Sequence, residues 1–112
     1  MAIDTWRQTE TLTILSGQQN SEELSFTGNN ARTKVLIQIM VPSAVTEILN
    51  LQVAEAPGGS YVIQRSGGVV MAYNGGFADQ AGPILAGAIR LRATTAVGAN
   101  RTVNVIVEPY AV

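Results

Sequence analysis

The sequence contains no cysteine and no histidine. Without them the chain has no thiol nucleophile, no thiolate or imidazole metal ligand, and no side chain that ordinarily shuttles protons near neutral pH. Most hydrolase chemistry of the Ser-His or Cys-His type and most zinc chemistry are therefore excluded. These absences predict a protein without catalytic activity, metal or cofactor.

Charge is also scarce, because Asp, Glu, Lys and Arg make up 13% of the chain against about 25% in ordinary soluble domains. Seven basic residues face eight acidic ones, which gives a net charge of −1. Such a balance argues against a nucleic-acid partner, which would require a basic surface. A sparsely charged surface of low net charge tends to associate, so we expect a protein partner or further copies of the chain. A weakly charged monomer is the alternative.

Long apolar runs are missing as well. No run approaches the 18 to 20 residues of a membrane span, and Met1–Trp6 lacks the basic and apolar regions of a secretion signal. We therefore expect a chain that is made in the cytoplasm and has no membrane partner.

Alternation of apolar and polar residues is the strongest pattern present, and it predicts β-strands. In Lys34–Val41, the residues Val35, Ile37, Ile39 and Val41 share one face. Comparable patterns predict about eight strands: Thr9–Leu15, Glu23–Thr27, Lys34–Val41, Leu49–Ala54, Tyr61–Arg65, Val69–Tyr73, Ile89–Thr94 and Val103–Val107.

Glycine pairs separate several of these strands and predict tight turns, because glycine adopts a positive φ without strain. Helix is expected only as single turns, since Pro83 and two glycines interrupt residues 77–88. The pattern predicts an all-β fold, one antiparallel β-sandwich of jelly-roll type over residues 11–112. Residues 1–10 are predicted to form an N-terminal arm.

Carboxylates are the remaining candidates for acid–base chemistry. Glu22 and Glu23 are adjacent, so a strand would turn them to opposite faces. The other acids are scattered, and no serine or threonine has a recognisable base. We therefore expect no enzyme activity.

Three arginines form a second candidate group. Arg90 and Arg92 share a strand face, and Arg101 opens the next strand. If those strands are neighbours, the three guanidiniums form a cationic patch that suits bidentate binding of carboxylates on an acidic protein surface. The alternative is an exposed strand edge with cross-strand pairs to Glu55 or Glu108.

The third candidate is Ser66–Ile89, in which Asp79 is the only charged residue. It is either a loop folded over the end of the sandwich or an association surface, because exposed apolar residues without charges mark interfaces. We assign Gly68–Leu85 to one association contact and Trp6, as the anchor of the arm, to another. The candidate interface side chains are Trp6, Tyr73, Phe77, Ile84, Leu85, Arg90, Arg92 and Arg101.

The order of several short motifs resembles that of small virion proteins of tailed bacteriophages, over residues 12 to 108. The motifs are Thr13–Gln18 (T-I-x-x-G-Q), Met40–Ala44 (M-x-P-S-A), Leu49–Val53, Ile89–Arg92 (I-R-L-R) and Asn100–Val103 (N-R-T-V). The sequence departs from this pattern at Val45-Thr46 and at Ala54–Gly59.

The resemblance implies a β-sandwich capsid decoration, or cement, protein on the outer surface of the head. Its implied partners are the major capsid protein and other copies of itself, with a homotrimer favoured. Two alternatives stay open: a tail, adaptor or head-fibre component, and, from another class, a carbohydrate-binding sandwich whose exposed aromatics would stack on sugar rings.

Overall fold

The structure is a computed structural model that describes residues 8–26, 34–84 and 86–110, and the regular elements in these ranges are all β-strands. They are β1 (Gln8–Ile14), β2 (Leu24–Ser25), β3 (Lys34–Met40), β4 (Leu49–Ala54), β5 (Val62–Ile63), β6 (Arg65–Ser66), β7 (Val69–Val70), β8 (Ala72–Tyr73), β9 (Ala78–Ile84), β10 (Ala88–Ala93) and β11 (Arg101–Tyr110).

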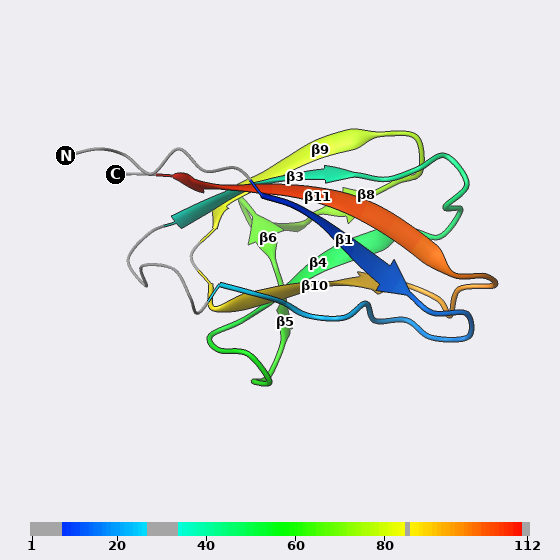
Figure 1. The fold of residues 1–112 in the computed structure, drawn as a ribbon, viewed down its shortest axis with the longest axis horizontal. Helices are drawn as coiled ribbons and strands as arrows, with labels where there is room; N and C mark the ends of the chain where they lie inside the picture. The colour runs from blue at the N-terminus through cyan, green and yellow to red at the C-terminus, as the bar shows by residue number, and fades with distance from the viewer. Residues whose placement is uncertain (1–7, 27–33, 85, 111–112) are drawn as a thin grey trace.

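The long strands form two antiparallel sheets that lie one above the other (Figure 1). The first sheet has the order β1-β11-β3-β9, and the second has the order β2-β10-β4-β5, with β8 also paired to β4. When β5 and β8 are taken together as one edge of β4, and the separate pair β6-β7 is set aside, eight principal strands remain. The first, last, third and sixth form one sheet, and the second, seventh, fourth and fifth form the other. This is jelly-roll topology, so the predicted fold is confirmed.

The core lies between the two sheets and is built from the alternating apolar positions. The four inward positions predicted on β3 and the following residue are all at most 4% exposed. Facing side chains come from the other long strands, and the most completely buried residues of the core include Leu12, Ile14, Ile37, Ile39, Leu49, Leu51, Ile89, Leu91, Val103 and Val105. The two sheets therefore share one hydrophobic cluster.

Strand β9 was not predicted, because Gly82 and Pro83 interrupt its sequence pattern. β9 lies at the edge of its sheet and pairs with β3 alone, and edge strands tolerate proline. The register slips between Val35 and Ile37, which is a β-bulge that accommodates the extra residue. Gly82 has a φ of 109° there, and any Cβ would meet the Ile84 nitrogen at 2.8 Å. Ser66–Ile89 is thus partly a core strand rather than a loop.

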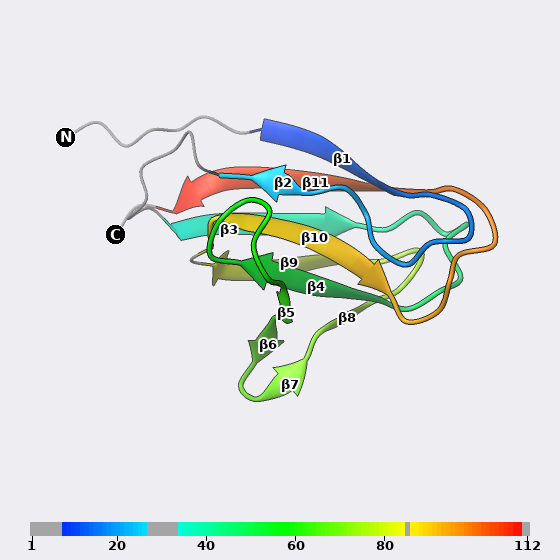
Figure 2. The same ribbon diagram turned by 90° about the horizontal axis from the view of Figure 1, so that it is seen from below.

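Two predicted boundaries are also wrong. β1 already begins at Gln8, opposite Val107, so the sheet includes the last three residues of the predicted N-terminal arm. The predicted strands Tyr61–Arg65 and Val69–Tyr73 are four two-residue strands instead. Of these, β6 and β7 pair only with each other, and their hairpin projects away from the sandwich (Figure 2).

Candidate functional site

Residues 61–77, here called the projecting segment, expose most of the large apolar side chains on the described surface. The hairpin forms there because Gly67 and Gly68 adopt φ values of 59° and 83° at its tip. Arg65 is the only charged residue of the segment. Seven large hydrophobic side chains are exposed among the described residues, and five belong to this segment: Val62, Ile63, Val69, Val70 and Phe77. Exposed apolar groups of this kind mark interaction sites.

Tyr73 fixes the projecting segment to the sandwich. Its side chain is only 1% exposed, and burial raises the pKa of its hydroxyl to about 12. The Asn50 Nδ2 atom donates a hydrogen bond of 3.0 Å to the Met71 carbonyl, and the Gln64 N–H donates one of 2.8 Å to the Leu51 carbonyl. The prediction of Tyr73 as an interface side chain is therefore wrong: it is the buried anchor of a segment that exposes its neighbours.

Phe77, by contrast, is 64% exposed. Its backbone is held, because its carbonyl accepts a hydrogen bond of 3.1 Å from the Val41 N–H and its N–H donates one of 3.3 Å to the Asn74 carbonyl. A fixed backbone with an exposed ring suits an interface anchor. Ile84, another predicted interface residue, is 3% exposed and lies in the core. Trp6 and Leu85 lie outside the described residues.

Arg90 and Arg92 lie on the outer face of the second sheet. The Arg90 Nε donates a hydrogen bond of 2.7 Å to the Gln52 Oε1, and its guanidinium carbon lies 4.1 Å from the centre of the Tyr61 ring. The Arg92 Nη1 and Nη2 atoms donate to the side-chain oxygens of Asn20 and Gln19, at 3.0 and 3.2 Å. Neutral groups therefore hold both guanidiniums in place.

Glu23 lies beside this pair of arginines but is engaged elsewhere. Its carboxylate accepts a hydrogen bond of 2.8 Å from the Gly58 N–H and another from the Tyr61 hydroxyl. These two hydrogen bonds, helped by the charge of Arg90, lower the pKa of Glu23. Burial of Tyr61 and its bond to Glu23 raise the pKa of that hydroxyl. The ring is thus held between Arg90 and Glu23.

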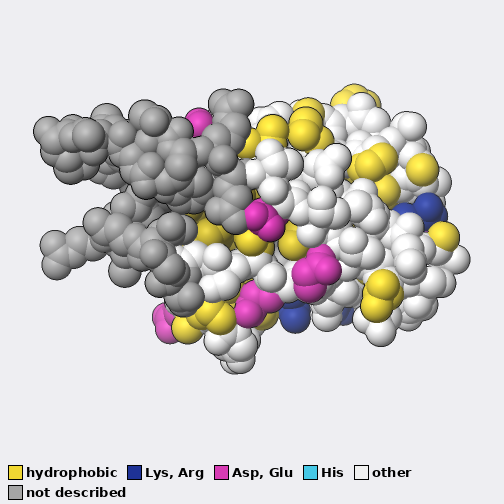
Figure 3. All heavy atoms as spheres, in the orientation of Figure 1, with side chains coloured by type: hydrophobic (Ala, Val, Ile, Leu, Met, Phe, Trp, Pro, Cys, Tyr) yellow, Lys and Arg dark blue, Asp and Glu magenta, His cyan; other side chains and the backbone are white. Residues whose placement is uncertain are grey.

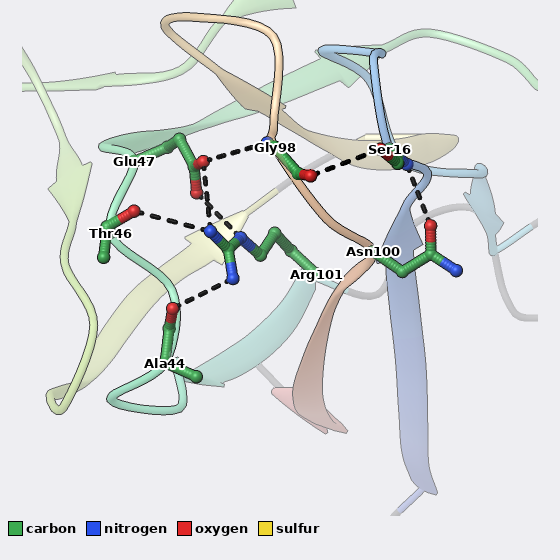
Figure 4. Close-up of polar contacts among 7 residues, drawn as sticks. All are labelled: Ser16, Ala44, Thr46, Glu47, Gly98, Asn100 and Arg101. Carbon is green, nitrogen blue, oxygen red and sulfur yellow. Dashed lines mark hydrogen bonds and ion pairs between the residues drawn. The ribbon is translucent and has the colours of Figure 1, made fainter.

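Arg101 lies elsewhere, in an arrangement that we call the Arg101 clamp (Figure 4). Its Nε is 3.0 Å from the Glu47 Oε1 and its Nη2 is 3.3 Å from the Glu47 Oε2. Its Nη1 donates a hydrogen bond of 3.0 Å to the Ala44 carbonyl. The hydrogen bonds to Arg101 are the first cause of the lowered pKa of Glu47. The clamp thereby ties the start of β11 to the loop between β3 and β4.

The neighbouring loops are attached to the same clamp. The Gly98 N–H donates to the Glu47 Oε2 at 3.4 Å, and the Gly98 carbonyl accepts from the Ser16 hydroxyl at 3.4 Å. The Asn100 Oδ1 accepts from the Ser16 N–H at 2.9 Å. Three loops at one end of the sandwich are therefore locked together, which is a structural role for Arg101.

The predicted patch of three arginines is consequently corrected to a pair. Arg90 and Arg92 lie on β10 of the second sheet, whereas Arg101 begins β11 of the first. Arg101 also shares its register face with the buried Val103, because its Cα partner is the buried Ile14. Its carboxylate partner is Glu47, which the sequence analysis did not single out.

The exposed pair Val62-Ile63 was not predicted, and Val69-Val70 was predicted only as part of the contact segment Gly68–Leu85. A signal was present, because two adjacent apolar residues in a strand turn to opposite faces, so one of each pair faces away from the core. On the face drawn in Figure 3, few acidic or basic side chains lie among the polar and apolar ones of the described residues.

Other sites are scarce in the described part of the chain. An open hollow on the outer face of the first sheet is lined by Leu36, Ile37, Gln38, Gln80, Ile106 and Glu108. In residues 8–26, 34–84 and 86–110, no three acidic, cysteine or histidine side chains lie close enough together to hold a metal ion. None of the described elements is a helix that could cross a membrane.

Of the described aromatic side chains, Phe26 and Tyr73 are buried, and one face of the Tyr61 ring is covered by Arg90. Phe77 alone among them offers an open ring for stacking on a sugar. No protein-family model matches the chain, and neither the curated proteins nor the solved structures contain a similar protein.

Proposed function

We propose that the chain is a non-enzymatic structural protein of a tailed-bacteriophage virion, a decoration protein that binds the outside of the capsid. The observation that carries the proposal is the projecting segment, which places five exposed apolar side chains beside a single charged residue. A surface of this composition suits protein association. The place in a virion rests on the resemblance of the sequence motifs.

The fold supports such a role by separating stability from binding. The core and the Arg101 clamp use the inner faces and one end of the sandwich, while the projecting segment leaves its apolar side chains available. Burial of apolar side chains at an interface contributes favourably to its binding energy. Removal of these side chains should therefore weaken binding without unfolding the sandwich.

The proposed partners are the major capsid protein and other copies of the chain, with a homotrimer as the favoured state. Many weak contacts, repeated over a shell, hold tightly because each bound site raises the effective concentration of the next. Trp6, on the N-terminal arm, is proposed as a second anchor. The protein would be made in the host cytoplasm and act on the outer capsid surface.

The test is co-sedimentation with heads of the phage or prophage that encodes the chain, after the chain's own gene has been deleted. We expect the double variant Val69→Ser/Val70→Ser to bind at least about tenfold more weakly. The matched control is Leu15→Ser/Ile48→Ser, which removes exposed apolar groups outside the projecting segment and should bind normally. Equal binding by both double variants would overturn the role of the segment.

A second arm separates head from tail. Purified tails of the same phage replace the heads, and saturable binding to tails alone would favour the tail or adaptor alternative. The carbohydrate-binding alternative has weaker support, because Phe77 is the only described aromatic ring that is open to solvent. Binding on a glycan array that is lost in Phe77→Ala would favour that alternative instead.

A further inference from the structure

Arg90 and Arg92 are held in position by direct contacts with neutral groups. They alternate along β10 with the buried Ile89 and Leu91, so both guanidiniums lie on the outer face of the second sheet. Neither forms an ion pair with any residue that the structure describes, and Glu23, the nearby acid, is bound to Gly58 and Tyr61. Their fixed orientation comes from amide oxygens and an aromatic ring.

Both side chains keep donors for a further ligand. A guanidinium has five N–H groups. Arg90 donates through its Nε to Gln52, and Arg92 donates through its two terminal nitrogens to Asn20 and Gln19. The terminal nitrogens of Arg90 and the Nε of Arg92 have no partner among the described residues. Because neutral neighbours already immobilise the side chains, little conformational entropy remains to be lost when an anion binds.

We propose that Arg90 and Arg92 form a docking site for an extended acidic segment of a partner protein, in which two carboxylates are separated by one residue. Residues two apart on a strand project from the same face with a separation of about 6.7 Å. A partner strand with acids two positions apart has the same spacing, so each carboxylate can meet one guanidinium in a charge-assisted hydrogen bond. The inference rests on the proposed assembly function and specifies its partner's chemistry.

The site is continuous with the projecting segment. Gln52, which holds Arg90, lies opposite Ile63 of β5, and Asn50, which lies opposite Arg92, is paired with Ala72 of β8. A partner segment can therefore place carboxylates over the arginines and apolar side chains against Ile63. Such an arrangement combines a polar contact that sets the register with an apolar contact that supplies affinity.

A protein carboxylate fits this face better than a nucleic acid. The chain has a net charge of −1, and Glu23 lies close enough to Arg90 for the two charges to interact. A continuous phosphate backbone would bring more negative charge past that acid than a segment with only two carboxylates. Nucleic-acid binding is therefore the competing outcome of the test.

The test is an NMR titration of the 15N-labelled protein with two blocked synthetic peptides of equal composition. The first, Thr-Val-Glu-Val-Glu-Val-Thr, has its acids on one face; the second, Thr-Val-Glu-Glu-Val-Val-Thr, has them on opposite faces. We expect the first peptide to shift the Nε–Hε signals of Arg90 and Arg92, and to bind at least about threefold more tightly than the second. Equal affinities, or shifts confined to other residues, would overturn the proposal.

Variants separate charge from geometry. Arg92→Gln should weaken binding of the first peptide about tenfold, the loss expected for one charge-assisted contact. Arg92→Lys should recover only part of that loss, because an ammonium lacks the planar fork. The matched control is Lys34→Gln, which removes the same charge from β3 in the other sheet and should bind normally. An unchanged backbone spectrum verifies folding in each variant.

Two further outcomes are decisive. Tighter binding of a ten-residue oligothymidine than of the first peptide would replace the protein ligand by a nucleic acid. Failure of the peptide to bind, with capsid binding by the unaltered chain retained, would remove this inference and leave the proposed function.

Discussion

The Arg101 clamp and the projecting segment use opposite kinds of surface chemistry. In the clamp, Arg101, Glu47 and Gly98 satisfy one another and tie loops together, and the side chains of the ion pair are only 16% and 11% exposed. In the projecting segment, Val62 and Val69 are 63% and 66% exposed and contribute little to the core. Polar contacts fix the clamp, whereas the apolar side chains of the projecting segment stay exposed to solvent.

The comparison shows where this domain, which has few charged residues, places an ion pair. Arg101 and Glu47 come from segments 54 residues apart in sequence and lock the loops at one end, where backbone strands alone would leave them loose. The projecting segment instead depends on one buried residue, Tyr73, and short strands. Because few contacts fix the projecting segment, it can present apolar groups to a partner while the sandwich keeps its stability.

The largest expected effect comes from crowding the place where Gly75, near the end of the projecting segment, packs against the β3–β4 loop of the clamp. A Cβ at Gly75 would lie 2.1 Å from the Val45 carbonyl oxygen, which is backbone and cannot move aside. Gly75→Ala should therefore lower the free energy of unfolding by about 3 kcal/mol, as overpacking does. Urea denaturation monitored by circular dichroism measures it. A loss below about 1 kcal/mol would contradict the tight packing of Gly75 against this loop.

The matched substitution in the hairpin should cost less. Gly67 has open space around its Cβ position, so only its positive φ of 59° opposes a side chain. Gly67→Ala should cost about 1 kcal/mol, the penalty for the left-handed conformation. If both glycine variants lose equal stability, the contrast between the open hairpin tip and the clamp loop that Gly75 contacts fails.

Loss of the ion pair should be milder and dependent on pH. The lowered pKa of Glu47 means that its contribution to stability is present above its ordinary value of 4.5 and is lost as the pH falls through the folded-state pKa. Arg101→Met should lower the melting temperature by several degrees at pH 7, and the difference from the unaltered chain should shrink as the pH falls below 4.5. A difference that stays constant until Glu47 is fully protonated would show that Glu47 contributes nothing.

The smallest expected effect on stability belongs to the exposed side chains of the hairpin. Val69→Ser/Val70→Ser should change the free energy of unfolding by less than about 0.5 kcal/mol per site, as is usual for exposed positions. The same denaturation experiment measures it. A larger loss would mean that these two side chains stabilise the fold. Their exposure would then not indicate a role in binding.

The sequence predicted the sandwich because its core obeys a simple period. Val35, Ile37 and Ile39 alternate with more exposed neighbours, and they are buried as expected. β9 was not predicted, because its Gly82 and Pro83 lie at a bulge on a sheet edge, where apolar and polar residues do not alternate. Strand propensity and the alternation of apolar residues predict regularly paired strands. The position of an irregular edge strand instead depends on the strand with which it pairs.

The candidate site was predicted only in part. Phe77, Arg90 and Arg92 are at the surface or half-buried on an outer face, as an interface requires, whereas Tyr73 and Ile84 are buried. Sequence proximity made Arg101 seem to belong with the other arginines. Its true partner depends on how the loops meet, which no local pattern in the sequence contains.

The most direct measurement compares hydrogen exchange in the free chain and in the chain bound to phage heads. The account predicts new protection of backbone amides in residues 61–77 on binding. It predicts no change in residues 43–48 and 97–101, which the clamp already holds in the free chain. Protection confined to the clamp loops, with the projecting segment exchanging as fast as before, would contradict the central claim that this segment makes the contact.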